Sequence, residues 1–259
     1  MSLEKTEGVI LRSIPKGETS KILTVYTRDF GKLALIAKGA KGPKSKFGGI
    51  LEPLSHLAIV FYMKDSREVQ LLSQGDLLNF FPGIRQDLEK TWPALAVCDL
   101  LNRLMPPRSG VGKEKSRASF GLLLDVLRGI DGADRNLINF WWWFLIKLIK
   151  ILGYRLELVR CVRCRQAVEG TMAVRVEKGG VICPRCDDEP GRRTVLTAGS
   201  LRFLVKLSRL LGPAVSTLNP SKGQVKEIDF FLDQFLKFHI ESFQGLKSIK
   251  FWREMRDRP

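Results

Sequence analysis

Four cysteines in two closely spaced pairs are the residues of this chain best suited to chemistry. Cys161 and Cys164 form one C-x-x-C pair, and Cys183 and Cys186 form a second pair after eighteen intervening residues. A two-residue gap lets both thiolates of a pair reach one ion at tetrahedral angles, and this separation between pairs is typical of zinc ribbons. We predict a structural Zn²⁺ site, because four thiolates leave no open position for water or substrate.

Other uses of four cysteines remain open. An iron–sulfur cluster also takes four thiolates, and two disulfides would require an oxidising compartment, which nothing else in the sequence indicates. A redox-active C-x-x-C would need a βαβ pattern beside it, and that pattern is absent. Arginines at positions 160, 163, 165 and 185 lie among the cysteines and would offset the negative charge of a four-thiolate centre. Zinc therefore remains the preferred ion.

The charge balance indicates a polyanionic partner. The 259 residues include 43 Lys and Arg against 27 Asp and Glu, which gives a net charge of +16. Such an excess suits nucleic acid and, less well, an anionic membrane. The first residues contain no signal-peptide pattern, and the most apolar run, residues 137–152, is interrupted by Lys147 and Lys150 and is too short to span a bilayer. We expect a cytoplasmic protein without a membrane partner.

Residues 1–80 have the pattern of a small β-barrel. Five short segments rich in Val, Ile, Leu and Tyr are separated by turns, at about 8–13, 20–27, 32–38, 55–63 and 69–73. Five strands in this length suit a closed barrel, because closure removes exposed strand edges. We predict an OB-fold nucleic-acid-binding domain here, with an SH3-like barrel as the alternative.

A glycine-rich loop with four lysines and no acid follows the third predicted strand. The lysines are Lys38, Lys41, Lys44 and Lys46. Glycines let backbone amides approach phosphates, and lysines release counterions when they contact a nucleic acid. We predict that this loop binds DNA, although such a charge run is often only a solvated, mobile loop. The cations Arg28 and Lys32 could extend the same surface. Tyr26, Phe30 or Phe47 could stack on bases, although each of these aromatic residues, taken alone, is more often part of the core.

Residues 81–259 read as a helical domain. Apolar residues recur with helical spacing at about 84–105, 114–128, 134–152, 197–211 and 225–243. The cysteine module, at about residues 159–195, falls between two of these helices, so we predict an insertion and not a separate domain. The predicted fold class is α+β, with a five-stranded OB-fold barrel followed by a helical bundle that carries an inserted four-cysteine zinc module.

Two aromatic and basic stretches are candidate partner sites. Trp143 falls on the same helical face as Lys147 and Lys150, so we expect it to be partly exposed and able to receive an apolar, acidic peptide or a base. Simple packing of Trp143 against the zinc module explains the pattern at least as well. Near the C-terminus, Trp252 and Arg253 lie in a basic tail that could bind an acidic partner or form a final docked helix.

No constellation of residues predicts catalysis. The chain lacks a P-loop, an H-E-x-x-H and a G-x-S-x-G motif, and His56 and His239 lie near no evident nucleophile. The acidic cluster at residues 187–189 could be imagined to hold Mg²⁺ in a nuclease, but we interpret it as a solvated turn. We therefore expect a binding protein and not an enzyme.

The order of these parts resembles the RecO family of bacterial DNA repair proteins. The resemblance is carried by residues 8–11 (GVIL), 31–33 (GKL), 37–40 (AKGA), 51–54 (LEPL) and the two C-x-x-C pairs. It implies an OB-fold, a helical domain with zinc, binding of single- and double-stranded DNA, and annealing of complementary strands. It also implies partnership with RecR and with the C-terminal tail of single-strand-binding protein in RecF-pathway recombination, at the bacterial nucleoid. By motif, its DNA face would include Lys32, Lys38, Lys41, Lys44 and Lys46.

A protein of another class remains the main alternative. A zinc-containing transcription or RNA-binding regulator would share the basic charge and the cysteines, but it would prefer particular base sequences. A nuclease is a third possibility and would degrade DNA in the presence of Mg²⁺.

Overall fold

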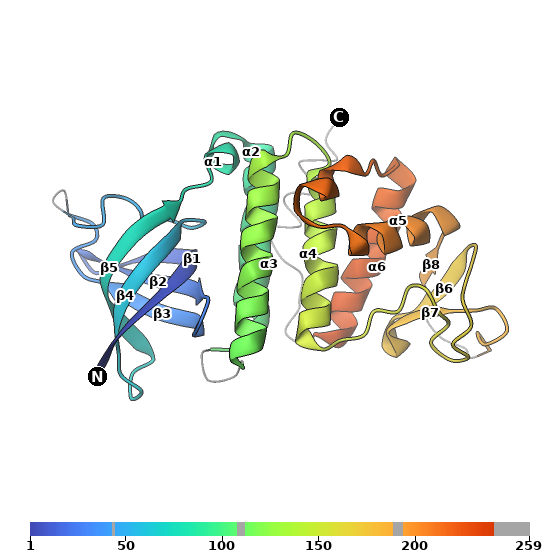
Figure 1. Ribbon diagram of the computed structural model, residues 1–259, viewed down its shortest axis with the longest axis horizontal. Coiled ribbons are helices and arrows are strands. Elements are labelled where there is room, and N and C mark those ends of the chain that lie inside the picture. The colour runs from blue at the N-terminus through green and yellow to red at the C-terminus, as the bar shows by residue number, and fades with distance from the viewer. Residues whose placement is uncertain (43–44, 108–111, 189–193, 241–259) are drawn as a thin grey trace. The chain divides into compact units, whose positions relative to one another are not determined.

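The computed structural model describes residues 1–42, 45–107, 112–188 and 194–240, and the chain divides into two compact units (Figure 1). Unit 1 spans Met1–Asp131, and unit 2 begins at Gly132. The predicted boundary at residue 80 lies inside unit 1, where it separates the barrel from the helices that follow. Among the helices of the described ranges, none combines the length and apolarity needed to cross a bilayer.

Unit 1 begins with a closed five-stranded barrel. Its strands are β1 (Ser2–Lys16), β2 (Ser20–Thr27), β3 (Gly31–Ala37), β4 (His56–Met63) and β5 (Val69–Asn79). The strand order is β1-β2-β3-β5-β4, and β1 also pairs with β4, which closes the barrel. Only the β3–β5 pairing is parallel. This arrangement confirms the predicted OB-fold, with β1 and β5 longer than the sequence pattern indicated.

Side chains that alternate along the strands fill the barrel. In β3, buried Leu33 and Leu35 alternate with half-buried Ala34 and Ile36, as expected when successive residues point to opposite faces of a sheet. The loop after β3 closes the interior with Phe47, and also with Leu51. The glycine- and lysine-rich loop is therefore anchored to the core by its apolar residues, while Lys38, Lys41 and Lys46 stay at the surface.

Three helices complete unit 1. They are α1 (Pro82–Gln86), α2 (Leu88–Leu104) and α3 (Lys113–Gly132). Asp87 caps α2 by accepting a hydrogen bond from the Glu89 backbone N–H. Helix α3 is tied to the β2–β3 turn by an ion pair between Arg117 and Asp29, with 2.8 Å between the guanidinium nitrogen and the carboxylate oxygen. These contacts cover one end of the barrel.

Unit 2 combines helices with a small antiparallel sheet. The helices are α4 (Leu137–Leu152), α5 (Ala198–Arg209), α6 (Lys222–His239) and the 3-10 segments η2 (Val176–Lys178) and η3 (Gly212–Thr217). The sheet has the order β7-β6-β8 and consists of β6 (Met172–Arg175), β7 (Gly180–Ile182) and β8 (Thr194–Leu196). Because this sheet lies between α4 and α5 in the chain, the cysteine module is an insertion among helices, as predicted.

Candidate metal centre and basic surfaces

The four cysteines of the two C-x-x-C pairs come together in unit 2. All four sulfur atoms lie within 4.8 Å of one another. The turn at each pair is closed by a backbone hydrogen bond, from Arg165 N–H to the Cys161 carbonyl at 3.0 Å and from Cys186 N–H to the Cys183 carbonyl at 2.9 Å. Strands β6 and β7 form a hairpin that brings the second pair back to the first.

The ionisation of these thiols fits a bound cation. Burial alone would raise the pKa of Cys161, but backbone N–H groups, including that of Cys183 at 3.4 Å, lower it to about 6. Contacts with the Cys183 sulfur and the other thiols raise the pKa of Cys186 to about 12. Four sulfurs this close cannot all ionise unless a positive ion offsets their charges. The donor set therefore fits a metal ion that prefers sulfur.

Two ion pairs brace the loop after the last cysteine. Asp187 pairs with Arg175 of β6 at 2.6 Å, and only 5% and 3% of the two side chains are exposed. Asp188 pairs with Arg163, which also donates to the Cys186 carbonyl at 3.1 Å. The interpretation of this acidic cluster as a solvated turn is wrong for Asp187, because the guanidinium of Arg175 lies beneath it. Glu189 lies outside the described residues.

The Arg175–Asp187 pair was missed by sequence reasoning. The two residues are twelve positions apart and belong to no periodic pattern that would link them. Only the β6–β7 hairpin places them side by side, so local sequence carries no signal of the pair.

Three of the predicted DNA-binding lysines share one end of the barrel. Lys38 follows the last residue of β3, and Lys38, Lys41 and Lys46 are all exposed. The Lys41 backbone N–H donates to the Thr19 carbonyl at 3.0 Å, and the Lys46 ammonium donates to the Ser73 carbonyl at 2.5 Å. These two bonds place the loop beside the β1–β2 turn and β5. Lys44 lies outside the described residues.

Arg28 and Lys32 lie at the other end of the barrel. They flank the start of β3, about 20 Å from its last residue for a strand of this length. Arg28 pairs with Glu7 at 3.6 Å, and the Lys32 ammonium donates to the Asn102 carbonyl near the end of α2. Burial also lowers the pKa of Lys32. The structure therefore does not bring these two cations together with the loop lysines.

We expect substitution of Lys32 to affect stability more than DNA binding. Lys32→Ala removes a charge-assisted hydrogen bond to α2 and should lower the free energy of unfolding by about 1–2 kcal/mol. Urea denaturation measures this change, and titration of DNA affinity with salt should give an unaltered slope. A shallower salt slope with unchanged stability would instead place Lys32 on the DNA-binding face.

Two of the three predicted stacking aromatics are buried. Tyr26 is 0% exposed, beside Ser116 and Ser119 of α3, and burial raises its pKa. Phe47 lies in the barrel core. The prediction of base stacking is wrong for both residues, because α3 covers one end of the barrel and the loop folds inward. Phe30 is half-buried and packs edge-to-face on Phe61, with ring centroids 5.5 Å apart.

The outward face of β2 and β3 beyond the contact with α3 is mostly aliphatic. Outward positions of β2 and β3 away from α3 hold Ile22, Thr24, Ala34 and Ile36, all half-buried. Tyr26 is the one aromatic residue in these two fully described strands. These two strands therefore offer bases no exposed ring, whereas β4 has the half-buried Tyr62 opposite Leu71 of β5.

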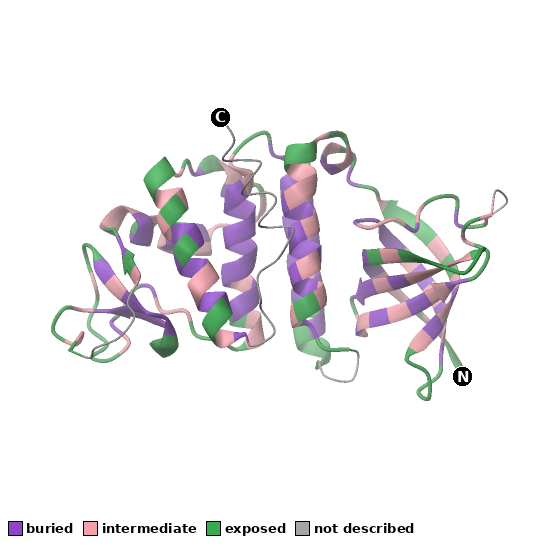
Figure 2. Cartoon of the chain, turned by 180° about the vertical axis from the view of Figure 1, so that it is seen from behind, coloured by how far each residue is buried: buried purple, intermediate pink, exposed green. Residues whose placement is uncertain are grey.

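Trp143 is buried, contrary to the expectation that it would be partly exposed. Figure 2 shows α4 as a largely buried helix, and Trp143 is only 2% exposed. Its indole N–H donates to the Leu210 carbonyl at 2.9 Å. On the same face, Asn139 donates to the carbonyls of Val215 and Leu218. The segment after α5 covers this face of α4, which helical periodicity within α4 could not reveal.

The other candidate partner residues differ in exposure or lie outside the described residues. Lys150 is exposed, and Lys147 is half-buried with its ammonium 5.9 Å from the centroid of the Trp143 ring system. Trp252 and Arg253 lie outside the described residues.

Fold and site together define a class of protein, namely one in which an OB-fold barrel with a basic loop precedes a helical part that carries a four-cysteine centre. Two family models match this chain: Recombination protein O N terminal over residues 1–81, and Recombination protein O C terminal over residues 85–248. The chain belongs to the RecO family of DNA repair and recombination proteins.

Full-length relatives agree with this assignment. DNA repair protein RecO of Chloroherpeton thalassium is 29% identical over 98% of this chain and 99% of its own length. The protein of the same name from Bacillus subtilis is 30% identical over 96% of this chain and 95% of its own length. The protein of this name from Pelotomaculum thermopropionicum is 30% identical over 97% of this chain and 94% of its own length.

Proposed function

We propose that this protein is a non-enzymatic mediator that binds single- and double-stranded DNA and anneals complementary strands. The observation that carries the proposal is the end of the barrel at which Lys38, Lys41 and Lys46 are all exposed. Lysines neutralise phosphates and reduce the repulsion between two strands. Contact through phosphates alone leaves the Watson–Crick edges of the bases free to pair with a second strand.

Partners follow from the family. We propose that the protein acts with RecR and helps to load recombinase onto strands that are coated by single-strand-binding protein. An acidic tail on the latter would suit a chain with a net charge of +16. We assign RecR and this tail to no particular residues.

We propose Zn²⁺ as the ion of the four-cysteine centre, held by Cys161, Cys164, Cys183 and Cys186. Four thiolates in a closed set suit zinc in a structural role. The ion would link the two C-x-x-C pairs of the module. Residues other than these cysteines would contact DNA.

The rate of strand annealing tests the function. Two complementary labelled strands, each coated with single-strand-binding protein, are mixed with this protein without ATP, and a non-complementary pair serves as the control. We expect acceleration of the complementary pair alone. Tight binding to bare DNA without acceleration would contradict the proposal and, if binding depends on base sequence, would favour a transcription or RNA-binding regulator. Mg²⁺-dependent loss of label would instead indicate a nuclease.

The salt dependence of binding tests the proposed DNA face. In a barrel variant, Lys38→Gln/Lys41→Gln/Lys46→Gln, loss of three phosphate contacts should reduce the slope of log affinity against log salt by about 2 for single strands. A control variant, Arg202→Gln/Lys222→Gln/Lys226→Gln, removes the same charge from exposed positions of α5 and α6. If the two variants have equal salt slopes, the loop is not part of the DNA-binding face. Equal zinc contents would show that both variants retain the cysteine module.

A further inference from the structure

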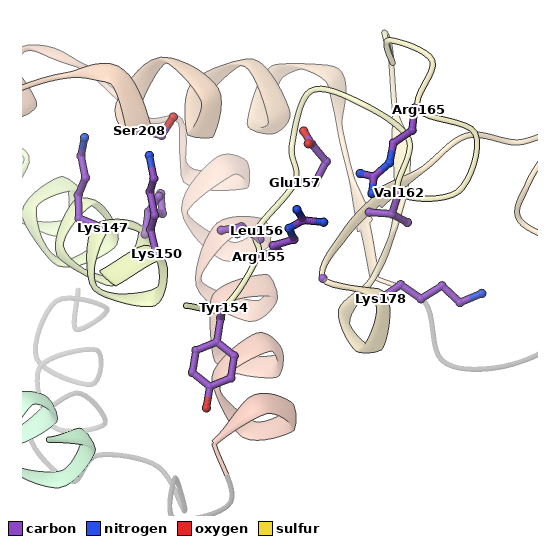
Figure 3. Close-up of a pocket in the computed structure, with 12 residues that line it drawn as sticks. Lys147, Lys150, Tyr154, Arg155, Leu156, Glu157, Val162, Arg165, Lys178 and Ser208 are labelled. Carbon is purple, nitrogen blue, oxygen red and sulfur yellow. The ribbon is translucent and has the colours of Figure 1, made fainter. Parts of the chain in front are cut away.

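A pocket of about 570 Å³ lies within unit 2, between α4, α5, the segment after α4 and the cysteine module (Figure 3). Its cationic lining residues are Lys147, Lys150, Arg155, Arg165 and Lys178. Its one acidic lining residue, Glu157, already accepts hydrogen bonds from the backbone N–H groups of Val159 and Arg160, at 2.9 and 3.1 Å. The pocket therefore carries an excess of positive charge.

Four of these cations form what we call the basic pocket. Figure 3 shows Lys147 and Lys150 extending in the same direction from α4. Arg155 extends from the segment after α4 and Arg165 from the module, with their guanidinium ends facing each other, while Lys178 and Tyr154 extend away. Within the described part of the chain, no carboxylate forms an ion pair with any of the four. Like charges three residues apart on a helix repel, and burial together with the Lys150 charge lowers the pKa of Lys147. An anion in the pocket would relieve this repulsion.

The module holds the two arginines of the basic pocket in place. Glu157 N–H donates to the Gly179 carbonyl and Val181 N–H donates to the Glu157 carbonyl, both at 2.9 Å, which fixes the segment that carries Arg155. A Cβ atom at position 180 would lie 2.3 Å from the Glu157 carbonyl oxygen, so this junction requires glycine. Arg165 directly follows Cys164 in the first turn of the module, with a φ of 64°. The backbone of both arginines is thus held in place before any ligand binds, which lowers the backbone entropy lost on binding.

We propose that the basic pocket binds phosphate groups of a nucleic-acid strand and so holds a second strand, separate from the one at the barrel loop. The inference rests on the proposed function and extends it. Guanidinium groups match phosphate oxygens through paired hydrogen bonds, and ammonium groups add charge. An acidic, apolar peptide needs a well-formed apolar anchor site, and here the apolar lining is limited to Ile146, which is only 8% exposed, and the half-buried Leu156 and Val162, beside Tyr154. Trp143, the nearby tryptophan, is buried and bonded to Leu210.

Two phosphate sites on one chain would explain how annealing is accelerated. Each unit would hold one strand, so two strands would share one protein and meet at a raised local concentration.

Strand bridging tests the proposal on the full-length, zinc-loaded protein. The pocket variant is Lys150→Gln/Arg155→Gln/Arg165→Gln, which spares the half-buried Lys147. An immobilised oligothymidylate is loaded with protein, and retention of a second, labelled oligothymidylate is measured, so that base pairing cannot contribute. Affinity for a single strand is measured by anisotropy in parallel. The barrel and control variants defined above complete the set, and thermal unfolding with zinc content verifies that each variant is folded.

We expect the pocket variant to retain single-strand affinity within about twofold but to lose second-strand retention by about tenfold or more, as expected for three lost phosphate contacts. If the pocket variant retains the second strand as well as the control variant does, the proposal is overturned. This applies whether or not the affinity of the pocket variant for an acidic peptide is reduced. Binding of free thymidine monophosphate without second-strand retention would also overturn it. The barrel variant could keep full affinity for single strands while the pocket variant loses second-strand retention. That result would support the proposal for the basic pocket and contradict the proposed DNA-binding role of the barrel loop.

Discussion

Removal of the metal should unfold the cysteine module while the barrel stays folded. The module is small, and its three strands have three or four residues each, so little apolar surface is available to stabilise it without an ion. Structural zinc sites supply about 10–16 kcal/mol of binding free energy in small zinc peptides, and that energy is lost on chelation. The barrel has its own core and contains none of the four cysteines.

Hydrogen exchange measures this effect region by region. After treatment with a chelator, or in Cys161→Ser/Cys164→Ser, amides of β6 and β7 should exchange rapidly while those of β2 and β3 stay protected. Cys98→Ser is the matched control, because Cys98 is buried in α2, outside the four-sulfur cluster. Protection of β6 and β7 that survives complete loss of metal would show that the module folds without the ion.

Arg175→Ala is the point substitution for which we expect the largest loss of stability in unit 2. It leaves the carboxylate of Asp187 buried without its partner, and removal of one member of a buried ion pair typically lowers the free energy of unfolding by about 3–5 kcal/mol. Arg163→Ala is the matched control. It breaks the neighbouring pair with Asp188, whose side chains are half exposed, so the loss should stay below about 1 kcal/mol.

Chemical denaturation of the two variants, with zinc content as a second readout, separates these expectations. The double substitution Arg175→Met/Asp187→Leu should recover most of the lost stability, because replacing both buried charges with apolar groups is often close to neutral. If Arg175→Ala and Arg163→Ala lower the free energy of unfolding equally, burial of the Arg175–Asp187 pair does not determine its contribution to stability.

Local pattern was enough to predict several parts of this protein. The C-x-x-C spacing predicted the four-sulfur cluster, because two sulfurs on one short turn are positioned by covalent geometry. Alternation in strands such as β3 predicted the barrel, and helical spacing predicted the helices, because each depends only on neighbours along the chain. Motif order supported the family, which the family models and full-length relatives then showed.

Tertiary structure alone decided which side chains stay accessible and which lie together. Sequence grouped Arg28 and Lys32 with the loop lysines, but the length of β3 separates them. It left Trp143 open to exposure, but the segment after α5 covers it. The basic pocket joins α4 to residues of the cysteine module in the same way. Burial and convergence depend on segments that are distant in the chain, and no local periodicity records which of them pack together.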